Sequence, residues 1–428
     1  MEIKVAKQFD VVVIGGGLVG ASCALSISKK NPSLHIAVVE ANQVTTDYHP
    51  SFDDRSIALA QQSVEYLQSL NLFEINAPYA AAIKKVSVSD KGHFGKTHIQ
   101  CDEFAKPSLG YVVEVNPFGR ALHQRLTQSN ISLFCPDSVT AIKQNADSNE
   151  LTLQSSEKLS AKLLVIADGA QSPTRHLLGL GFNTQPYEQG AIIANIEVAG
   201  GHNHHAFERF TQNGPMALLP MSNNRYSLVW CMRQEHIEQH MALSESDFLS
   251  VLQITFGYRA GRFIKVGMRA SYPLVYGQVE SLTAHRTVVI GNAAHAIHPI
   301  AGQGFNLGLR DVQVLSDLIA NSEHDLGSYA FTRQYSIKRS DDIKTVMTLT
   351  DALVRLFSNS SRVLALGRSI GLFSMDLFHV ISFADISELR MLVLKITFSI
   401  RLFITCQLIN TLPSISKSSP ILLQYSII

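Results

Sequence analysis

Runs and alternations of apolar residues divide the chain into strands and helices from its first residues onward. Phe9 to Ile14 form a continuous β-branched run, which is typical of a strand buried on both faces of a parallel sheet. The stretch ASCALSISKK that follows has helical periodicity, and HIAVVE is a second apolar strand that ends at Glu40. The pattern therefore predicts a βαβ unit at the start of the chain.

The pattern changes twice further along. Amphipathic helices are predicted at about residues 61–70 and 119–128, and buried strands at ISLFC and KLLVIADG. From about residue 190 to 276, alternating segments predict an antiparallel sheet with one helix, near Glu245 to Phe256, and with Trp230 in its core. RTVVIGNAA then returns to a buried parallel-type strand followed by a helix, and residues 326–378 are helical in pattern. The predicted fold class is α/β, with a Rossmann-like domain, an inserted, mostly antiparallel sheet and a C-terminal helical segment.

Three glycines lie between the first strand and its helix, in the spacing G-x-G-x-x-G. Gly15 permits a tight turn, Gly17 lets backbone N–H groups approach a pyrophosphate, and Gly20 lets the helix pack on the strand. The phosphate would rest on the positive end of the helix. Glu40 follows about 20 residues later, where an acid accepts from ribose hydroxyls and disfavours a 2′-phosphate. The unit predicts dinucleotide binding and leaves FAD and NAD both open.

Composition excludes several kinds of partner. Lys and Arg total 36 against 35 Asp and Glu, so no global charge recruits nucleic acid or an anionic membrane. The five cysteines are scattered singly, and no signal-peptide pattern precedes the first strand, which together predict a cytoplasmic protein. The apolar stretch from Met391 to Leu412 carries Lys395 and Arg401, which argues against a transmembrane span and leaves peripheral membrane contact open.

Two further motifs follow predicted strands. VIADGAQSPTR places Asp168 at the end of a strand and Arg175 at the start of a helix, and by itself Asp168 is most simply a helix N-cap. GNAAHAIHPIAGQGFNLGLRD, at 291–311, contains His295 and His298 at i, i+3. No third ligand lies near them in sequence and a proline interrupts, so no metal site is predicted. A proton relay and a packed structural role both stay open for His298.

Together GGGLVG, ADGAQSPTR and GNAAHAIHPIAGQGFNLGLRD resemble the motifs of single-component, FAD-dependent aromatic hydroxylases of the p-hydroxybenzoate hydroxylase type, in matching order across about residues 9–345. FDDRSIAL, PYEQGAIIANIE and AFERFTQNGPMALLPMSNNRYSLVWC are most similar to the ubiquinone-biosynthesis branch, above all the 2-octaprenyl-6-methoxyphenol hydroxylases. The resemblance implies a FAD-binding domain at 1–85, 102–183 and 284–345 and a substrate domain at 86–101 and 184–283. A C-terminal helical segment at 346–390 and an atypical tail at 391–428 would follow.

The resemblance also implies roles for particular residues. Asp168 would serve both FAD and a passing nicotinamide nucleotide, while the segment at 291 would lie along the ribityl chain and the isoalloxazine. There Asn292 replaces the aspartate usual in the family, and its carbonyl accepts hydrogen bonds without carrying a charge. A helix beginning near Gln303 would aim N–H groups at the flavin, and Pro299 would shape the wall facing the substrate. The implied cofactor-binding residues are Gly15, Gly17, Gly20, Glu40, Arg55, Arg120, Asp168, Asn292, Gly302, Gln303 and Gly304, and the implied catalytic residues are His298 and Pro299.

The implied activity is hydroxylation of a 2-polyprenyl-6-methoxyphenol to the 1,4-benzoquinol in ubiquinone biosynthesis. NADH or NADPH would reduce bound FAD, O2 would form a flavin C4a-hydroperoxide, and the phenol ring would capture its distal oxygen. Association with other quinone-biosynthesis enzymes and peripheral contact with the inner membrane stay open. The competing interpretations are hydroxylation of another ring position, a small soluble phenol as substrate, and a non-catalytic flavin-containing assembly subunit.

Overall fold

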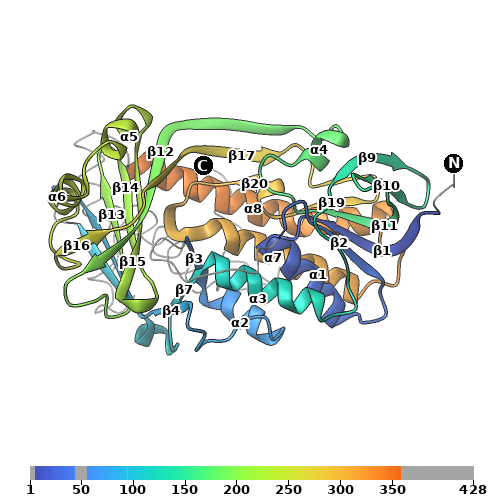
Figure 1. Ribbon diagram of the computed structural model, residues 1–428, viewed down its shortest axis with the longest axis horizontal. Helices are drawn as coiled ribbons and strands as arrows, with labels where there is room; N and C mark the ends of the chain where they lie inside the picture. Colours follow the sequence, from blue (N-terminus) through green and yellow to red (C-terminus); the bar gives the residue numbers. More distant parts are fainter. Residues whose placement is uncertain (1–4, 44–54, 94, 358–428) are drawn as a thin grey trace, which may run out of the picture.

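A computed structural model describes residues 5–43, 55–93 and 95–357, arranged as three sheets with helices on their faces (Figure 1). This arrangement confirms the predicted α/β class. The predicted helical segment extends past Phe357, and its remainder lies outside the described residues, as does the tail from Met391.

The first sheet contains the βαβ unit predicted from the start of the chain. β1 (Lys7–Ile14) lies parallel to β2 (Ile36–Val39) on one side and to β11 (Lys158–Ile166) on the other. Val11, Val12 and Val13 have no exposed surface, which is why their strand is apolar without alternation. The strand order is β18–β19–β11–β1–β2–β8, with β10 and β9 added beside β11 by antiparallel pairing. The other strands are β8 (Ser132–Phe134), β9 (Val139–Gln144), β10 (Asn149–Leu153), β18 (Thr283–Ala284) and β19 (Thr287–Val289).

The second sheet is mostly antiparallel, as its alternating sequence predicts. Its order is β20–β17–β12–β15–β14–β13–β5–β6 with β16 beside β12, and β5 runs parallel to β13. The long strand β12 crosses into this sheet from the side of the first (Figure 1). The domain boundaries themselves stay a prediction. The strands are β5 (Lys85–Asp90), β6 (Lys96–Gln100), β12 (Phe182–Val198), β13 (His205–Thr211), β14 (Gly214–Pro220), β15 (Arg225–Arg233), β16 (Phe263–Val266), β17 (Ala270–Val279) and β20 (His295–Ala296).

Helices α5 (Gln234–Met241) and α6 (Glu245–Phe256) lie at the outer end of the second sheet (Figure 1). α6 has the predicted bounds, and the Ser244 hydroxyl caps it by accepting from the Asp247 N–H. Trp230 is buried beside Phe248 of this helix, as its apolar strand predicts. The prediction of a single helix here is wrong, because α5 buries only Ile237 fully and so leaves a weak apolar signal.

A small third sheet consists of β3 (Ser56–Ala60), β7 (Gly110–Glu114) and β4 (Ala80–Ile83), all antiparallel. The two predicted amphipathic helices follow its strands directly, as α2 (Gln61–Ser69) and α3 (Val115–Thr127). Helix α1 (Leu18–Lys30) packs against α3 and against α7 (Gln303–Ala320). These contacts join the third sheet to the dinucleotide-binding unit.

The segment after β19 is not the helix that RTVVIGNAA predicts. Gly291–Ala293 and Ile300–Gly302 are short 3-10 turns, and His295–Ala296 pair with β17 between them. Gly291 and Gly302 have φ of +60° and +62°, a conformation that glycine adopts readily and that interrupts an α-helix.

α7 begins at Gln303, as predicted, and packs against α8 (Tyr329–Phe357). The remaining helix, α4 (Pro173–Leu177), follows the first sheet's β11, and two more 3-10 turns lie at Cys101–Phe104 and Ser222–Asn224. Among the helices of residues 5–357 that the structure describes, none is both long enough and apolar enough to cross a membrane.

Candidate active site

The loop between β1 and α1 is shaped by its glycines. Gly15 has φ of +99°, and a Cβ there would lie 2.5 Å from the Ala167 carbonyl oxygen. A Cβ on Gly20 would overlap the Gly15 carbonyl oxygen. A Cβ on Gly17, the N-cap of α1, would meet no atom within 4 Å. Two glycines therefore serve packing, while Gly17 leaves the helix N-terminus bare, as an anion site requires.

Glu40 closes this loop from the end of β2. Its Oε2 accepts from the Gly16 N–H at 2.6 Å, and its Oε1 accepts from the Asn42 N–H at 2.8 Å. The two bonds hold the partly buried carboxylate beside the glycine loop. Each oxygen keeps a further lone pair, so the side chain retains the capacity to accept from ribose hydroxyls.

Asp168 follows β11, next to the same loop. Its Oδ2 accepts from the Thr174 N–H of α4 at 3.1 Å, whereas its Oδ1 is buried without a hydrogen-bond partner in the described chain. The N-cap of α4 is Ser172, whose hydroxyl accepts from the Arg175 N–H at 3.0 Å. Asp168 is therefore not the N-cap that the sequence taken alone suggests, although one of its oxygens supports the first turn. The buried acceptor left over is a place for a ligand hydroxyl or N–H.

Arg175 ties the second motif to the third. The residue is 2% exposed, and its guanidinium donates to the carbonyl oxygens of Ala293, at 2.6 Å, and Ala170, at 2.8 Å. It also lies over the Phe182 ring, 4.2 Å from the centroid. The sequence predicted only that Arg175 lies at the start of a helix. Its hydrogen bond to Ala293, in the segment at 291, was not predicted.

The segment at 291–306 touches all three sheets. It leaves β19 of the first sheet, and its residues His295 and Ala296 pair with Gln278 and Gly277 of the second. Asn306 then binds the third sheet, because its Oδ1 accepts from the Ala60 N–H at 2.8 Å and its Nδ2 donates to the Ala58 carbonyl oxygen at 2.9 Å. The predicted ribityl and isoalloxazine segment thus lies where the sheets meet.

A buried charge network fixes the start of this segment. Asp311 accepts from the Gly291 N–H at 2.9 Å, lies 2.8 Å from His295 Nε2, and accepts from Arg339 Nε at 2.7 Å. Arg339 also pairs with Asp342, which in turn pairs with Arg310 at 2.7 Å. Burial raises the pKa of Asp311, but Arg339 and His295 outweigh burial and hold it below its ordinary value. None of these pairs was predicted from the sequence.

His298 is fully buried and electrically neutral. Its Nδ1 accepts from the Ile300 N–H at 3.2 Å, so the proton of the neutral ring belongs on Nε2, which lies 3.4 Å from Gln189 Oε1. The Tyr187 ring meets it edge-on, with centroids 5.2 Å apart. Burial lowers the pKa of His298 to about 3, which disfavours a role as proton acceptor near neutral pH.

Helix α7 presents a bare N-terminus to this region. Its N-cap is Gly302, where a Cβ would lie 2.8 Å from the Ala58 Cβ, so packing on β3 requires a glycine. Gln303 is buried, whereas a Cβ on Gly304 would meet no atom within 4 Å. The first turn carries no acidic side chain. A helix N-terminus of this kind favours a group that carries negative charge.

The other predicted residues lie around these elements. Arg55 is exposed directly before β3, and its carbonyl oxygen accepts from the Val115 N–H at 2.8 Å. Arg120 is partly buried on α3, the helix that packs against α1. Asn292 is exposed on the first 3-10 turn, and partly buried Pro299 directly precedes the second. Their roles toward a ligand stay predictions.

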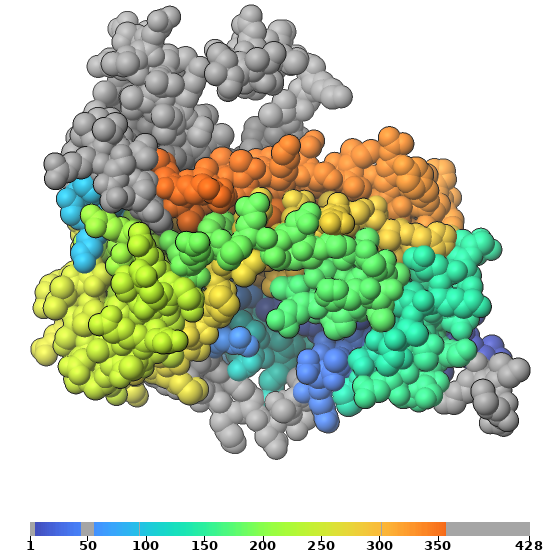
Figure 2. Space-filling view, turned by 90° about the horizontal axis from the view of Figure 1, so that it is seen from above, coloured from blue at the N-terminus to red at the C-terminus, as the bar shows by residue number. Residues whose placement is uncertain are grey.

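These features fit a dinucleotide such as FAD. The orphaned acceptor of Asp168 and the open positions at Gly17 and Gly304 leave room and partners for one. In the space-filling view the surface is hollowed between the yellow-green part, which contains the second sheet, and the green-to-teal part. Blue N-terminal residues are visible inside the hollow (Figure 2). Within residues 5–43, 55–93 and 95–357, no group of three His, Cys, Asp or Glu side chains is placed to hold a metal ion.

Known proteins are similar to this chain in sequence and in fold. The family model for the FAD binding domain matches residues 8–350. Ubiquinone hydroxylase UbiL of Rhodospirillum rubrum is 34% identical over 374 residues, which cover 86% of each chain. The 3-demethoxyubiquinol 3-hydroxylase of Escherichia coli is 28% identical over 374 residues, covering 86% of this chain and 94% of its own. The p-nitrophenol 4-monooxygenase PnpA of Pseudomonas putida DLL-E4, 17% identical, has a similar fold, with a TM-score of 0.70 over 95% of this chain and 99% of that one. The chain therefore belongs to the FAD binding domain family, as a FAD-dependent monooxygenase related to the hydroxylases of ubiquinone biosynthesis.

Proposed function

We propose that the chain hydroxylates a polyprenylated phenol, converting a 2-polyprenyl-6-methoxyphenol to the 1,4-benzoquinol in ubiquinone biosynthesis. The observation that carries this proposal is the convergence of three strand-end motifs on one site, with the free acceptor of Asp168 and the bare helix N-termini at Gly17 and Gly304. The kinship with the quinone hydroxylases of Rhodospirillum rubrum and Escherichia coli supports the substrate class.

FAD is the group that this site would hold. Once bound and reduced by NADH or NADPH, it would supply the activation of O2 that transfers an oxygen atom to an electron-rich phenol ring. The glycine loop would place the pyrophosphate on α1, Glu40 would accept from ribose hydroxyls, and Asn292 would accept from the ribityl chain. The full set that we assign to the cofactor is Gly15, Gly17, Gly20, Glu40, Arg55, Arg120, Asp168, Asn292, Gly302, Gln303 and Gly304.

The N-terminus of α7 would stabilise negative charge on the flavin. An uncapped helix N-terminus carries about half a positive charge on its free N–H groups. Such fixed dipoles stabilise charge most strongly where water is excluded. The absence of a side chain at Gly304 would let the flavin edge approach these N–H groups closely, whereas Gly302 packs on β3.

His298 and Pro299 would form the wall on the substrate side. Because His298 is buried, neutral and held by the Ile300 N–H, it would act as a fixed surface that excludes water from the reacting ring rather than as a proton relay. Pro299 has no N–H and a fixed φ, so it would add a rigid apolar surface beside it.

A polyprenylated substrate dissolves in the bilayer, since each buried CH2 contributes about 0.8 kcal/mol. We therefore propose that the chain meets its substrate at the membrane surface as a peripheral protein, beside other enzymes of quinone biosynthesis. The ring position and the length of the prenyl chain belong to the same proposal.

Oxidation of NADH and NADPH by the purified FAD-loaded chain tests the proposal, with and without a short-chain prenylated methoxyphenol. The expected result is oxidation stimulated by the phenol, with a product one oxygen atom heavier. Oxidation that the phenol leaves unchanged would support a non-catalytic assembly subunit instead. Equal turnover of an unprenylated phenol would point to a small soluble substrate.

A further inference from the structure

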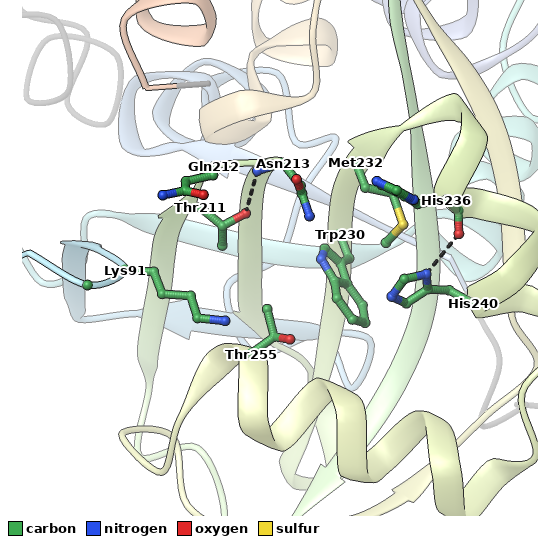
Figure 3. A pocket seen from close by; sticks show the side chains of 10 residues that line it. Lys91, Thr211, Gln212, Asn213, Trp230, Met232, His236, His240 and Thr255 are labelled. Carbon is green, nitrogen blue, oxygen red and sulfur yellow. Dashed lines mark hydrogen bonds between the residues drawn. The ribbon is translucent and has the colours of Figure 1, made fainter. Parts of the chain in front are cut away.

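A second cavity lies at the outer end of the second sheet, among the β5–β6 turn, the β13–β14 turn, β15, α5 and α6 (Figure 3). Its volume is about 350 Å³, within the roughly 300–1,000 Å³ typical of small-molecule sites. We call it the Trp230 pocket. Trp230 and Cys231 are neighbours on β15 and point to opposite faces of the sheet. The Cys231 face carries Gln189, the partner of His298, so the sheet separates the Trp230 pocket from the candidate active site.

Lys91 brings into this pocket a positive charge that pairs with no acid among the described residues. Its side chain extends into the cavity (Figure 3), and it forms no ion pair or side-chain hydrogen bond in the described chain. Burial, and then the charge of nearby Arg209, lower the pKa of the Lys91 ammonium. Among the described residues that line the pocket, none is Asp or Glu. A partly buried ammonium without a counter-charge is stabilised by an anionic ligand.

Trp230 adds a second donor to the same space. Its side chain is 3% exposed, and within the part of the chain that the structure describes its indole N–H has no acceptor. The indole nitrogen lies on the edge of the ring turned toward Lys91 and Thr211 (Figure 3). The indole nitrogen itself is not fully buried, so water accepts from it, and a ligand oxygen in the pocket would take the place of that water.

The rest of the wall favours an organic ligand. His240 lies edge-on to Trp230, with ring centroids 5.0 Å apart, and is held by its Nδ1–H, which donates to the His236 carbonyl oxygen at 2.8 Å. Met232 lines the cavity next to Trp230. The apolar surfaces of Trp230 and Met232 thus lie beside two donors, the Lys91 ammonium and the Trp230 N–H. This combination suits a molecule with a charged head and an apolar body.

We propose that the Trp230 pocket binds a small organic anion, with a carboxylate or phosphate head on Lys91 and the Trp230 N–H and an apolar body against Trp230 and Met232. This site is independent of the phenol hydroxylation proposed above, because it lies across the sheet from His298 and shares no residue with the flavin site. A ligand bound there has no access to the reacting atoms and acts as an accessory ligand.

Tryptophan fluorescence reports on this pocket directly, because Trp230 is the only tryptophan of the chain. The full FAD-loaded chain is titrated separately with inorganic phosphate and with benzoate, and flavin content is checked throughout. We expect a saturable change in Trp230 emission with at least one probe. Phosphate alone would identify a phosphate head, and benzoate alone a carboxylate with an apolar body.

Variants of Lys91 test the assigned contact. Lys91→Met should weaken binding about tenfold or more, as the loss of a hydrogen bond to a charged group implies, whereas Lys91→Arg should retain it. Lys96→Met, an exposed position on β6, is the matched control and should leave the affinity unchanged. Emission that changes with neither probe in saturable fashion would overturn the proposal, and so would equal affinities of the wild-type and Lys91→Met chains. The wild-type titration decides even where a substitution prevents folding.

Discussion

Asp311 Oδ2 lies 2.8 Å from Nε2 of His295, and neither side chain has any exposed surface. The same carboxylate receives the Gly291 N–H and the Arg339 guanidinium. One residue of α7 therefore holds the start of the third motif, its first histidine and helix α8 together. The histidine that first suggests chemistry in this segment is a structural partner of a buried acid.

Replacing Asp311 with Asn should destabilise the chain by about 3–5 kcal/mol, because buried Arg339 would lose one of its two charge partners and keep only Asp342. The lowered pKa of Asp311 means that its contribution is present above the unfolded pKa of about 3.9 and is lost as pH falls through the lower folded value. Urea unfolding at neutral pH measures the loss. Asp317→Asn removes an exposed pair of the same helix with Lys30 and should cost at most about 1 kcal/mol. Equal unfolding midpoints for the two variants would contradict this account of the network.

Replacing Gly304 with Val should abolish FAD retention while leaving the flavin-free fold almost unchanged. A Cβ at this position meets no protein atom within 4 Å, so the space that a side chain enters is the space we assign to the flavin. The flavin-to-protein absorbance ratio and thermal unfolding of the flavin-free chain measure the two effects. Gly20→Ala, where the new Cβ overlaps the Gly15 carbonyl oxygen, should instead lower the stability of the flavin-free chain. Normal flavin content in Gly304→Val would refute the placement.

Replacing Asn292 with Asp should tighten FAD binding by up to about tenfold, because a hydrogen bond to a charged acceptor is worth roughly 1.5–3 kcal/mol against about 1 for a neutral one. The side chain is exposed, so water already screens part of the added charge. Equilibrium titration of the flavin-free chain with FAD gives the affinity, and Asn292→Ala should weaken it. An aspartate variant that binds FAD no better than wild type would count against a ribityl contact at this position.

Replacing His298 with Gln should flatten the acid dependence of stability. Burial lowers the pKa of His298 to about 3, so the unfolded chain takes up a proton near pH 6.5 that the folded chain refuses. The contribution of His298 to the free energy of unfolding is therefore fully present above about pH 6.5. It falls by up to about 1.4 kcal/mol per pH unit as the pH is lowered toward 3. Denaturant unfolding between pH 7 and pH 5 shows the slope. If wild type and variant lose stability in parallel, His298 is not held neutral by burial.

Local signals predicted much of the fold. The apolar pattern placed α6 at its observed bounds, and the motif at 291–311 placed the start of α7 near Gln303. The path from Gly291 to Gly302 was not predictable, because it depends on pairing of Ala296 with Gly277 of another strand. In such a case tertiary pairing decides between helix and extended chain, and the local sequence does not.

The candidate site likewise contains residues that the sequence predicts and contacts that it does not. Gly15, Gly17, Gly20 and Glu40 follow from spacing along one βαβ unit, whose geometry is nearly fixed by its connection. The contact of Asp311 with Arg339 spans 28 positions, and that of Asn306 with the Ala60 N–H spans 246. A single sequence contains no pattern that identifies such distant partners, because many other polar residues lie at similar separations along the chain.

Analysis of quinone precursors in a cell strain that lacks its own 2-polyprenyl-6-methoxyphenol hydroxylase tests the central claim most directly. The strain accumulates the methoxyphenol, and expression of this chain should clear it and restore the 1,4-benzoquinol and later quinones. Gly304→Val, which is expected to lose FAD, should leave the precursor in place. Persistence of the methoxyphenol despite a soluble, FAD-loaded wild-type chain, or oxygen inserted at another ring carbon, would contradict the proposed function.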